Sequence, residues 1–92
     1  MIRIRVTPSA YRDLSRLVAW LAPKTPRGAD LAADAMTAAI ESLSEMPSRG
    51  RPIGRGLREL PVKFGRYGYI VRYRMDDHEV VVFRIRHVRE DR

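Results

Sequence analysis

The chain has 92 residues, a net charge of +7 and no cysteine. This length suits one small domain, and the lack of cysteine excludes a disulfide scaffold, a thiol nucleophile and Cys-based zinc sites. No apolar run approaches the roughly 18 residues that span a membrane, and the N-terminal pattern is that of a strand rather than a signal peptide. We therefore expect one domain over residues 1–92, in the cytoplasm, with no membrane contact.

The positive charge is concentrated in the second half of the chain. Residues 1–48 carry six basic and five acidic side chains, a net charge of +1, whereas residues 49–92 carry twelve basic and six acidic, a net charge of +6. Sixteen of the eighteen basic residues are arginine, whose planar fork binds carboxylates and phosphates bidentately. The asymmetry predicts an anionic partner, which can be nucleic acid, an acidic protein or an anionic surface.

The first segment predicts a short strand followed by a helix. Apolar residues at positions 2, 4 and 6 alternate with arginines, which is typical of a half-buried strand. Thr7 is a good N-cap and Pro8 suits the first helical position, so the helix should run to about Leu21. Trp20 falls outside the apolar stripe of this helix. It is either a partner contact or packs on a neighbouring helix or arginine.

The middle of the chain predicts a second helix, a basic loop and a strand. Two prolines place a turn at residues 22–28, and a helix from about Gly28 to Met46 should pair with the first as an antiparallel hairpin. A loop over residues 48–56 follows, and then a strand from Leu57 to Phe64. Pro61 has no backbone N–H to donate to a neighbouring strand, so this strand should lie at an edge of the sheet or be bulged there.

The last third predicts a β-hairpin, because two runs rich in Val, Ile, Tyr and Phe flank a polar tip at residues 77–79. Burying both apolar sets on one side requires Tyr73 opposite Phe83 and Arg72 opposite Arg84. The sets expected to be buried are Tyr69, Val71, Tyr73 and Met75 in the first strand, and Val81, Phe83, Ile85 and His87 in the second.

These elements predict an α+β fold of order β-α-α-β-β-β, in which the helical hairpin packs on one face of an antiparallel sheet. The other face then carries arginines. Like charges opposite one another are destabilising, so this face is either a solvated surface or a cluster that binds an anion.

The sequence contains no Ser-His-Asp set, no HExxH motif, no Gly-rich nucleotide fingerprint and no carboxylate cluster. We therefore expect neither a cofactor nor a metal site. One candidate for chemistry remains. Neighbouring arginines disfavour the charged form of His87, which can then act as a neutral base in metal-free RNA cleavage, with Arg58, Arg84 and Arg89 at the phosphate. The alternative is a structural histidine at the sheet edge.

Several short motifs, in this order, resemble the ParE/RelE superfamily of type II toxins over nearly the whole chain. They are Leu43-x-x-x-Pro47, Leu57-Arg-Glu-Leu60, Tyr69-Ile-Val-Arg-Tyr73 and Phe83-Arg-Ile-Arg-His87. The resemblance implies the RelE/ParE-like toxin fold. It also implies an acidic, ParD-like antitoxin, encoded beside the toxin, that wraps the toxin in a hetero-oligomeric complex. This agrees with the basic second half of the chain.

The superfamily contains two functional branches, and three hypotheses stay open. RelE-like members are ribosome-dependent mRNA endonucleases, and ParE-like members inhibit DNA gyrase. No tyrosine follows Tyr73, and the ending Arg84-Ile-Arg-His87 is more similar to ParE. The resemblance thus favours a gyrase inhibitor without catalytic residues. The alternatives are a RelE-like endonuclease that uses Arg58, Arg84, His87 and Arg89, and an inactive module that acts only with its antitoxin.

The expected binding surfaces follow from these hypotheses. The basic tail from residue 84 to residue 92 should contact the target through Arg84, Arg86, His87 and Arg89. Large side chains at the borders of the helix stripes, with arginines of the sheet, should contact the antitoxin. These residues are Tyr11, Trp20, Met36, Arg72 and Arg74.

Overall fold

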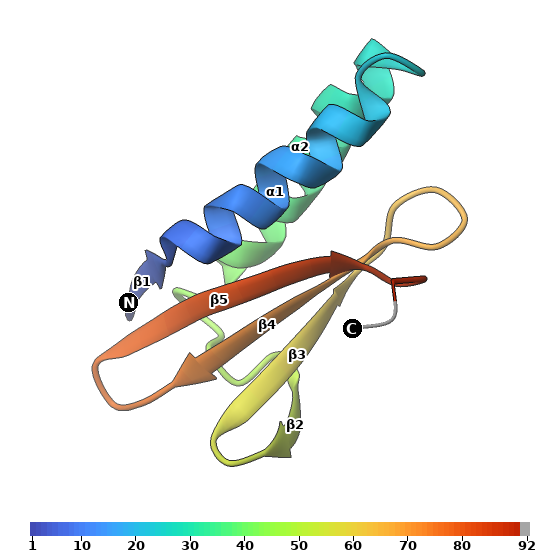
Figure 1. Ribbon diagram of the computed structural model, residues 1–92. Coiled ribbons are helices and arrows are strands. Elements are labelled where there is room, and N and C mark those ends of the chain that lie inside the picture. The colour runs from blue at the N-terminus through green and yellow to red at the C-terminus, as the bar shows by residue number, and fades with distance from the viewer. Residues whose placement is uncertain (91–92) are drawn as a thin grey trace.

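The computed structural model describes residues 1–90, in which two helices pack on one face of a five-stranded sheet (Figure 1). This arrangement confirms the α+β class and the helical hairpin on one face. The sheet order is β1-β5-β4-β3-β2. The elements are β1 (Arg3–Val6), α1 (Pro8–Leu21), α2 (Pro26–Ser42), β2 (Arg51–Gly54), β3 (Leu57–Val62), β4 (Tyr69–Met75) and β5 (Glu79–His87).

The sheet differs from the sequence prediction at both of its edges. β2 forms inside the segment predicted as a loop and pairs antiparallel with β3. All four of its residues are exposed, so the alternation that reveals a half-buried strand is missing. At the other edge β1 pairs with β5 in parallel, which makes the sheet mixed rather than antiparallel. All the other elements, from α1 to β4, lie between these two strands in the chain, which far exceeds the dozen or so residues that a parallel connection needs.

Both helices begin at the same local signal. The Thr7 hydroxyl accepts from the Ala10 N–H at 3.1 Å, and the Thr25 hydroxyl accepts from the Gly28 N–H at 3.0 Å. A proline follows each threonine at the first helical position. The predicted bounds of α1 are confirmed. α2 begins at Pro26 rather than Gly28, because the second Thr-Pro pair starts the helix instead of belonging to the turn. It ends at Ser42 rather than Met46.

A bulge in β5 changes which of its residues are buried. Arg72 faces Arg84 as predicted, but Tyr73 faces Val82 rather than Phe83. An extra residue in one strand inverts the faces of everything beyond it. Val80 and Val82 are therefore fully buried instead of Val81 and Phe83. The prediction for β4 is correct at Tyr69, Val71 and Tyr73, which are all buried.

The core lies between the hairpin and the sheet, and its largest fully buried side chains include Tyr73, Met36, Leu43 and Ile85. The Tyr73 hydroxyl donates to the Pro47 carbonyl at 2.7 Å and accepts from the Gly50 N–H at 2.8 Å, which ties the loop after α2 to the sheet. β2 pairs with only the first half of β3, so Pro61 lies where β3 is an edge, as expected. Neither helix within residues 1–90 has the length and hydropathy of a membrane span.

Candidate functional site

An open groove of about 420 Å³ lies between the C-terminal half of α1 and the loop that joins β3 to β4. Leu17, Trp20 and Leu21 line it from α1. The opposite side is aromatic, and the rim is basic. Phe64, Tyr67, Tyr69 and His87 form the aromatic side, and Arg16, Arg66 and Arg89 lie at the rim.

The aromatic rings of the groove support one another through edge contacts. The His87 ring lies edge-on to Tyr69, with centroids 5.5 Å apart, and to Tyr67 at 5.9 Å. The Arg89 guanidinium lies 4.8 Å from the Tyr67 ring centroid and donates to the Tyr67 hydroxyl at 2.8 Å. Such contacts hold aromatic side chains in place. The groove thus has a preformed apolar floor beside positive charge.

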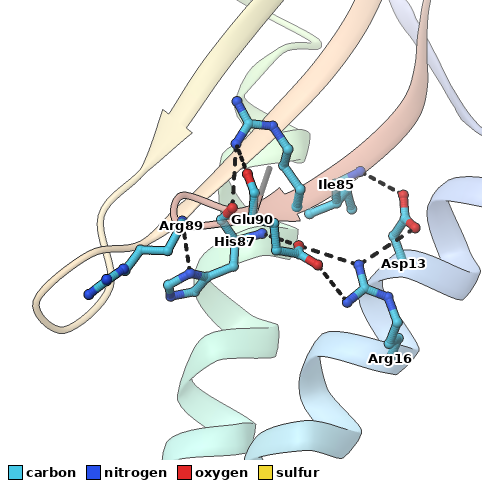
Figure 2. A network of polar contacts seen from close by, with 7 residues as sticks. Asp13, Arg16, Ile85, His87, Arg89 and Glu90 are labelled. Atoms are coloured by element: carbon cyan, nitrogen blue, oxygen red, sulfur yellow. Dashed lines mark hydrogen bonds and ion pairs between the residues drawn. The ribbon is translucent and has the colours of Figure 1, made fainter. Parts of the chain in front are cut away.

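Two carboxylates, one from α1 and one from the tail after β5, accept hydrogen bonds from the end of β5, as Figure 2 shows. β1 stops opposite Val82, so the next amides on that edge of β5 have no strand partner. The Ile85 N–H donates to Asp13 Oδ2 of α1 at 2.9 Å, and the His87 N–H donates to Glu90 Oε1 at 2.7 Å. Glu90 Oε2 also accepts from Arg16 Nη1 at 2.9 Å. The tail after β5 is therefore attached to α1.

The pKa of Glu90 is lowered from its ordinary value of 4.5. Partial burial raises this pKa, but the hydrogen bonds from the His87 N–H and Arg16, with the charges of Arg16 and Arg84, outweigh burial. The ionised carboxylate is thus the form that attaches the tail.

We expect the tail to detach from α1 in acid. A folded-state pKa below the unfolded value of 4.5 means that the attachment contributes fully above about pH 4.5 and is lost as the pH falls through the folded pKa. The His87 amide resonance, followed by NMR from about pH 6 to about pH 3, should move with this titration. Glu90→Gln should remove that transition. A His87 amide that stays unchanged in acid while the core resonances persist would contradict the attachment.

The sheet face opposite the helices carries a cluster of arginines. Arg72 and Arg84 face each other across β4 and β5, and Arg74 and Arg86 lie on the same face by alternation. Glu59 of β3, only 5% exposed, accepts from Arg72 Nε at 3.0 Å and pairs with Arg51 at 3.5 Å. Burial raises the pKa of Glu59, but the hydrogen bond and charge of Arg72, with Arg86 and Arg51, lower it overall. Glu59 thus relieves the repulsion within the cluster.

The four residues considered for RNA cleavage do not share a site. Arg58 donates to the carbonyls of Ser48 and Gly50 at 3.1 and 2.7 Å and pairs with Tyr73. His87 pairs with Tyr69, about 13 Å further along β4. Arg84 and His87 are three residues apart in a regular strand segment, so they point to opposite faces. Only His87 and Arg89 are adjacent, since the Arg89 N–H donates to His87 Nδ1 at 3.1 Å.

The residues expected at the antitoxin surface are dispersed. Trp20 is 64% exposed and lines the groove, whereas Tyr11, 58% exposed, lies outside it. Met36 is fully buried in the core, so its assignment to the antitoxin surface is wrong: the wide apolar arc of α2 faces both α1 and the sheet. Arg72 and Arg74 lie on the face opposite the helices. The end of the predicted target-binding tail, residues 91–92, falls outside the described residues.

Sequence reasoning missed Asp13, Glu59 and Glu90. A register that placed Glu59 opposite Arg72, as the structure does, would have indicated their ion pair. Asp13 and Glu90 had no such signal, because the contacts that join them to α1 and β5 cross 72 and 74 positions of the chain and follow no strand register. No cluster of metal-ligating side chains occurs within residues 1–90.

Comparison with known proteins identifies the family to which this chain belongs. A family model described as the ParE toxin of type II toxin-antitoxin system, parDE, matches residues 4–92. The chain is 42% identical over 89 residues to Toxin RelE1 of Caulobacter vibrioides, covering 97% of this chain and 96% of the relative. It is 39% identical to Toxin RelE3 of the same organism over the full length of both.

Two solved structures share the fold. The chromosomal ParDE toxin-antitoxin system of P. aeruginosa matches with a TM-score of 0.77 at 20% identity, covering 96% of this chain and 97% of the other. The toxin-antitoxin complex RelBE2 of Mycobacterium tuberculosis matches with a TM-score of 0.65 at 29% identity, covering 94% and 96%. With the family model spanning nearly the whole sequence, the chain belongs to the ParE toxin family of the ParE/RelE superfamily and is a type II toxin of that group.

Proposed function

We propose that this toxin is ParE-like: it binds DNA gyrase in the cytoplasm and inhibits it without a catalytic residue of its own. The observation that carries this proposal is the dispersal of Arg58, Arg84, His87 and Arg89. General-base cleavage of RNA requires the base, the acid and the cations to lie within hydrogen-bond reach of one phosphate. Arg58 instead binds loop carbonyls far from His87.

The proposed target surface is the end of β5 with the tail that follows it. Arg84 and Arg86 present positive charge on the open face. His87 ends the same strand at the groove, and Arg89 follows it in the tail. A basic surface on a rigid sheet steers an acidic partner into place.

The proposed neutralising partner is an acidic, ParD-like antitoxin in a hetero-oligomeric complex. An amphipathic segment of such a partner fits the apolar floor and basic rim of the groove. The net charge of +7 favours this association.

Inducible expression without antitoxin, with pulse labelling of DNA and protein synthesis, separates the possible targets. Early arrest of DNA synthesis, with protein synthesis initially intact, is the expected result. Purified chain should also inhibit supercoiling by gyrase in vitro. Immediate arrest of protein synthesis with cut mRNA would overturn the proposal, and normal growth would indicate a binding module without toxicity.

Arg84→Glu should weaken gyrase inhibition by about thirtyfold, since losing a charge contact at an interface costs about 2 kcal/mol or more. Within residues 1–90 the Arg84 side chain makes no hydrogen bond or ion pair, and its charge acts on Glu90 only without direct contact. The core should therefore persist, which a thermal melt of the variant checks. Arg12→Glu, at an exposed position of α1, is the matched control and should retain inhibition. Equal inhibition by both variants would remove Arg84 from the target surface.

A RelE-like mRNA endonuclease is the second candidate, and the open face supports it. Four arginines in adjacent strands, Arg72, Arg74, Arg84 and Arg86, present cations suited to an RNA backbone. The relatives in Caulobacter vibrioides are named RelE toxins. Cleavage on this face would use residues other than His87, so mRNA cutting that survives His87→Ala would support this candidate.

A further inference from the structure

Two donors from different elements converge on one carboxylate position at the rim of the groove. Arg16 Nη1 donates to Glu90 Oε2 at 2.9 Å, and the His87 N–H donates to Glu90 Oε1 at 2.7 Å. Figure 2 shows the Glu90 carboxylate between Arg16 of α1 and His87 of β5. The donors are held by a helix and a strand, whereas the acceptor belongs to the short tail beyond β5. The pair of donors is therefore a preformed site whose occupant can be exchanged.

The position is open to another molecule. The side chains of Arg16 and Glu90 are 53% and 35% exposed, and both residues line the groove together with His87. The amide of His87 lies on the edge of β5 beyond the end of β1, so no neighbouring strand covers it. A charged pair that faces solvent exchanges partners at little cost.

We propose that Arg16 and the His87 N–H form a carboxylate-binding site at which an acidic side chain of the antitoxin replaces Glu90. This inference depends on the proposed function, since it assumes that the antitoxin occupies the groove. Glu90 already shows which chemical group the site takes. The apolar floor next to it, with Arg66 and Arg89 at the rim, suits an acidic amphipathic segment.

The tail is then a competitor of the antitoxin in the same chain. Antitoxin binding must first break the contacts of Glu90, so Glu90 lowers the affinity of the complex. Displacement of the Glu90 carboxylate also frees the tail from α1. It would thereby loosen the contacts of Arg86, which donates to the carbonyls of His87, Val88 and Glu90 at 3.4, 3.5 and 3.2 Å. Binding in the groove would thereby change the surface proposed to contact the target.

The test measures the affinity of the full chain for the purified protein encoded by the adjacent reading frame, by calorimetry. Glu90→Gln should bind about three- to tenfold tighter and Arg16→Gln about tenfold weaker, as expected for one charge-assisted contact. In the Arg16→Gln background, Glu90→Gln should add less than about twofold. The proposal would be overturned if Glu90→Gln bound the antitoxin with weaker or unchanged affinity. It would also be overturned if Glu90→Gln raised the affinity as much in the Arg16→Gln background as in the unchanged chain.

Two controls separate the site from general charge effects. Glu41→Gln, at an exposed position of α2, raises the net charge by the same amount and should leave the affinity unchanged. A second control uses acetate as the probe and no protein partner. Acetate should shift the NMR resonance of the His87 amide in Glu90→Gln to saturation, compared with the same concentration of sodium chloride. The double variant with Arg16→Gln should show no such shift. No saturable shift would overturn the site. A shift without binding of the adjacent gene product would keep the site and contradict the proposed partner.

Discussion

Trp20→Ala should weaken antitoxin binding by about 2 to 4 kcal/mol, roughly 30- to 1,000-fold. The reason is that a few aromatic anchor residues carry most of the binding free energy of an interface. The indole is 64% exposed in the free chain and lines the groove, with Lys24 Nζ 3.9 Å from its ring centroid. Its removal takes nothing from the core, so the melting temperature should stay unchanged. Calorimetry with the adjacent gene product and a thermal melt give both values.

Two exposed residues serve as controls for Trp20. Leu31→Ala truncates a large apolar side chain of α2 that is 47% exposed and outside the groove, and should change affinity less than about threefold. Tyr11→Ala tests the outer surface of α1, which sequence reasoning also favoured. If Tyr11→Ala weakens binding as strongly as Trp20→Ala, the antitoxin extends over α1 beyond the groove. If Trp20→Ala behaves like Leu31→Ala, the groove is not the docking site.

Gly68→Ala should lower the stability of the fold by about 3 kcal/mol or more, which is roughly 12 to 24 °C in melting temperature for a domain of this size. Gly68 has a φ of +102°, and a Cβ there would overlap the Val62 carbonyl oxygen. This residue closes the loop between β3 and β4, and its carbonyl accepts from the Val88 N–H at 3.0 Å. The substitution should therefore also loosen the aromatic side of the groove.

Gly65→Ala is the matched control in the same loop. Its φ is +60°, but nothing lies within 4 Å of an added Cβ, so only about 1 kcal/mol of left-handed strain is expected. A thermal melt of the two variants separates backbone strain from steric overlap. Equal losses would show that the Val62 carbonyl moves aside without cost.

Much of the fold could be predicted from the sequence because the signals are local. Thr7-Pro8 begins α1, and the alternation of β4 assigns its buried face, within a span of a few residues. The Arg72–Arg84 pairing followed from burying both strands of the hairpin on one side. Order and spacing of the short motifs were enough to indicate the ParE/RelE superfamily, which the family model confirms.

Errors arose where neighbours distant in sequence decide the outcome. The bulge at Phe83 reverses the faces of the first half of β5, and no residue type marks it. Met36 has the apolar character expected of either an interface or a core residue, and only the packing of α2 against α1 and the sheet places it inside. β2 has no buried face, so it left no periodic pattern.

The sequence by itself determined the helices, most of the strands, the basic second half and the superfamily, since each depends on composition or on residues close together in the chain. Only the tertiary structure decided which side chains meet. Asp13 and Arg16 of α1 reach Ile85 and Glu90 across more than 70 positions, and Arg58 and His87 are kept apart by the register of three strands. Such contacts follow from the relative placement of whole elements, which local patterns do not encode.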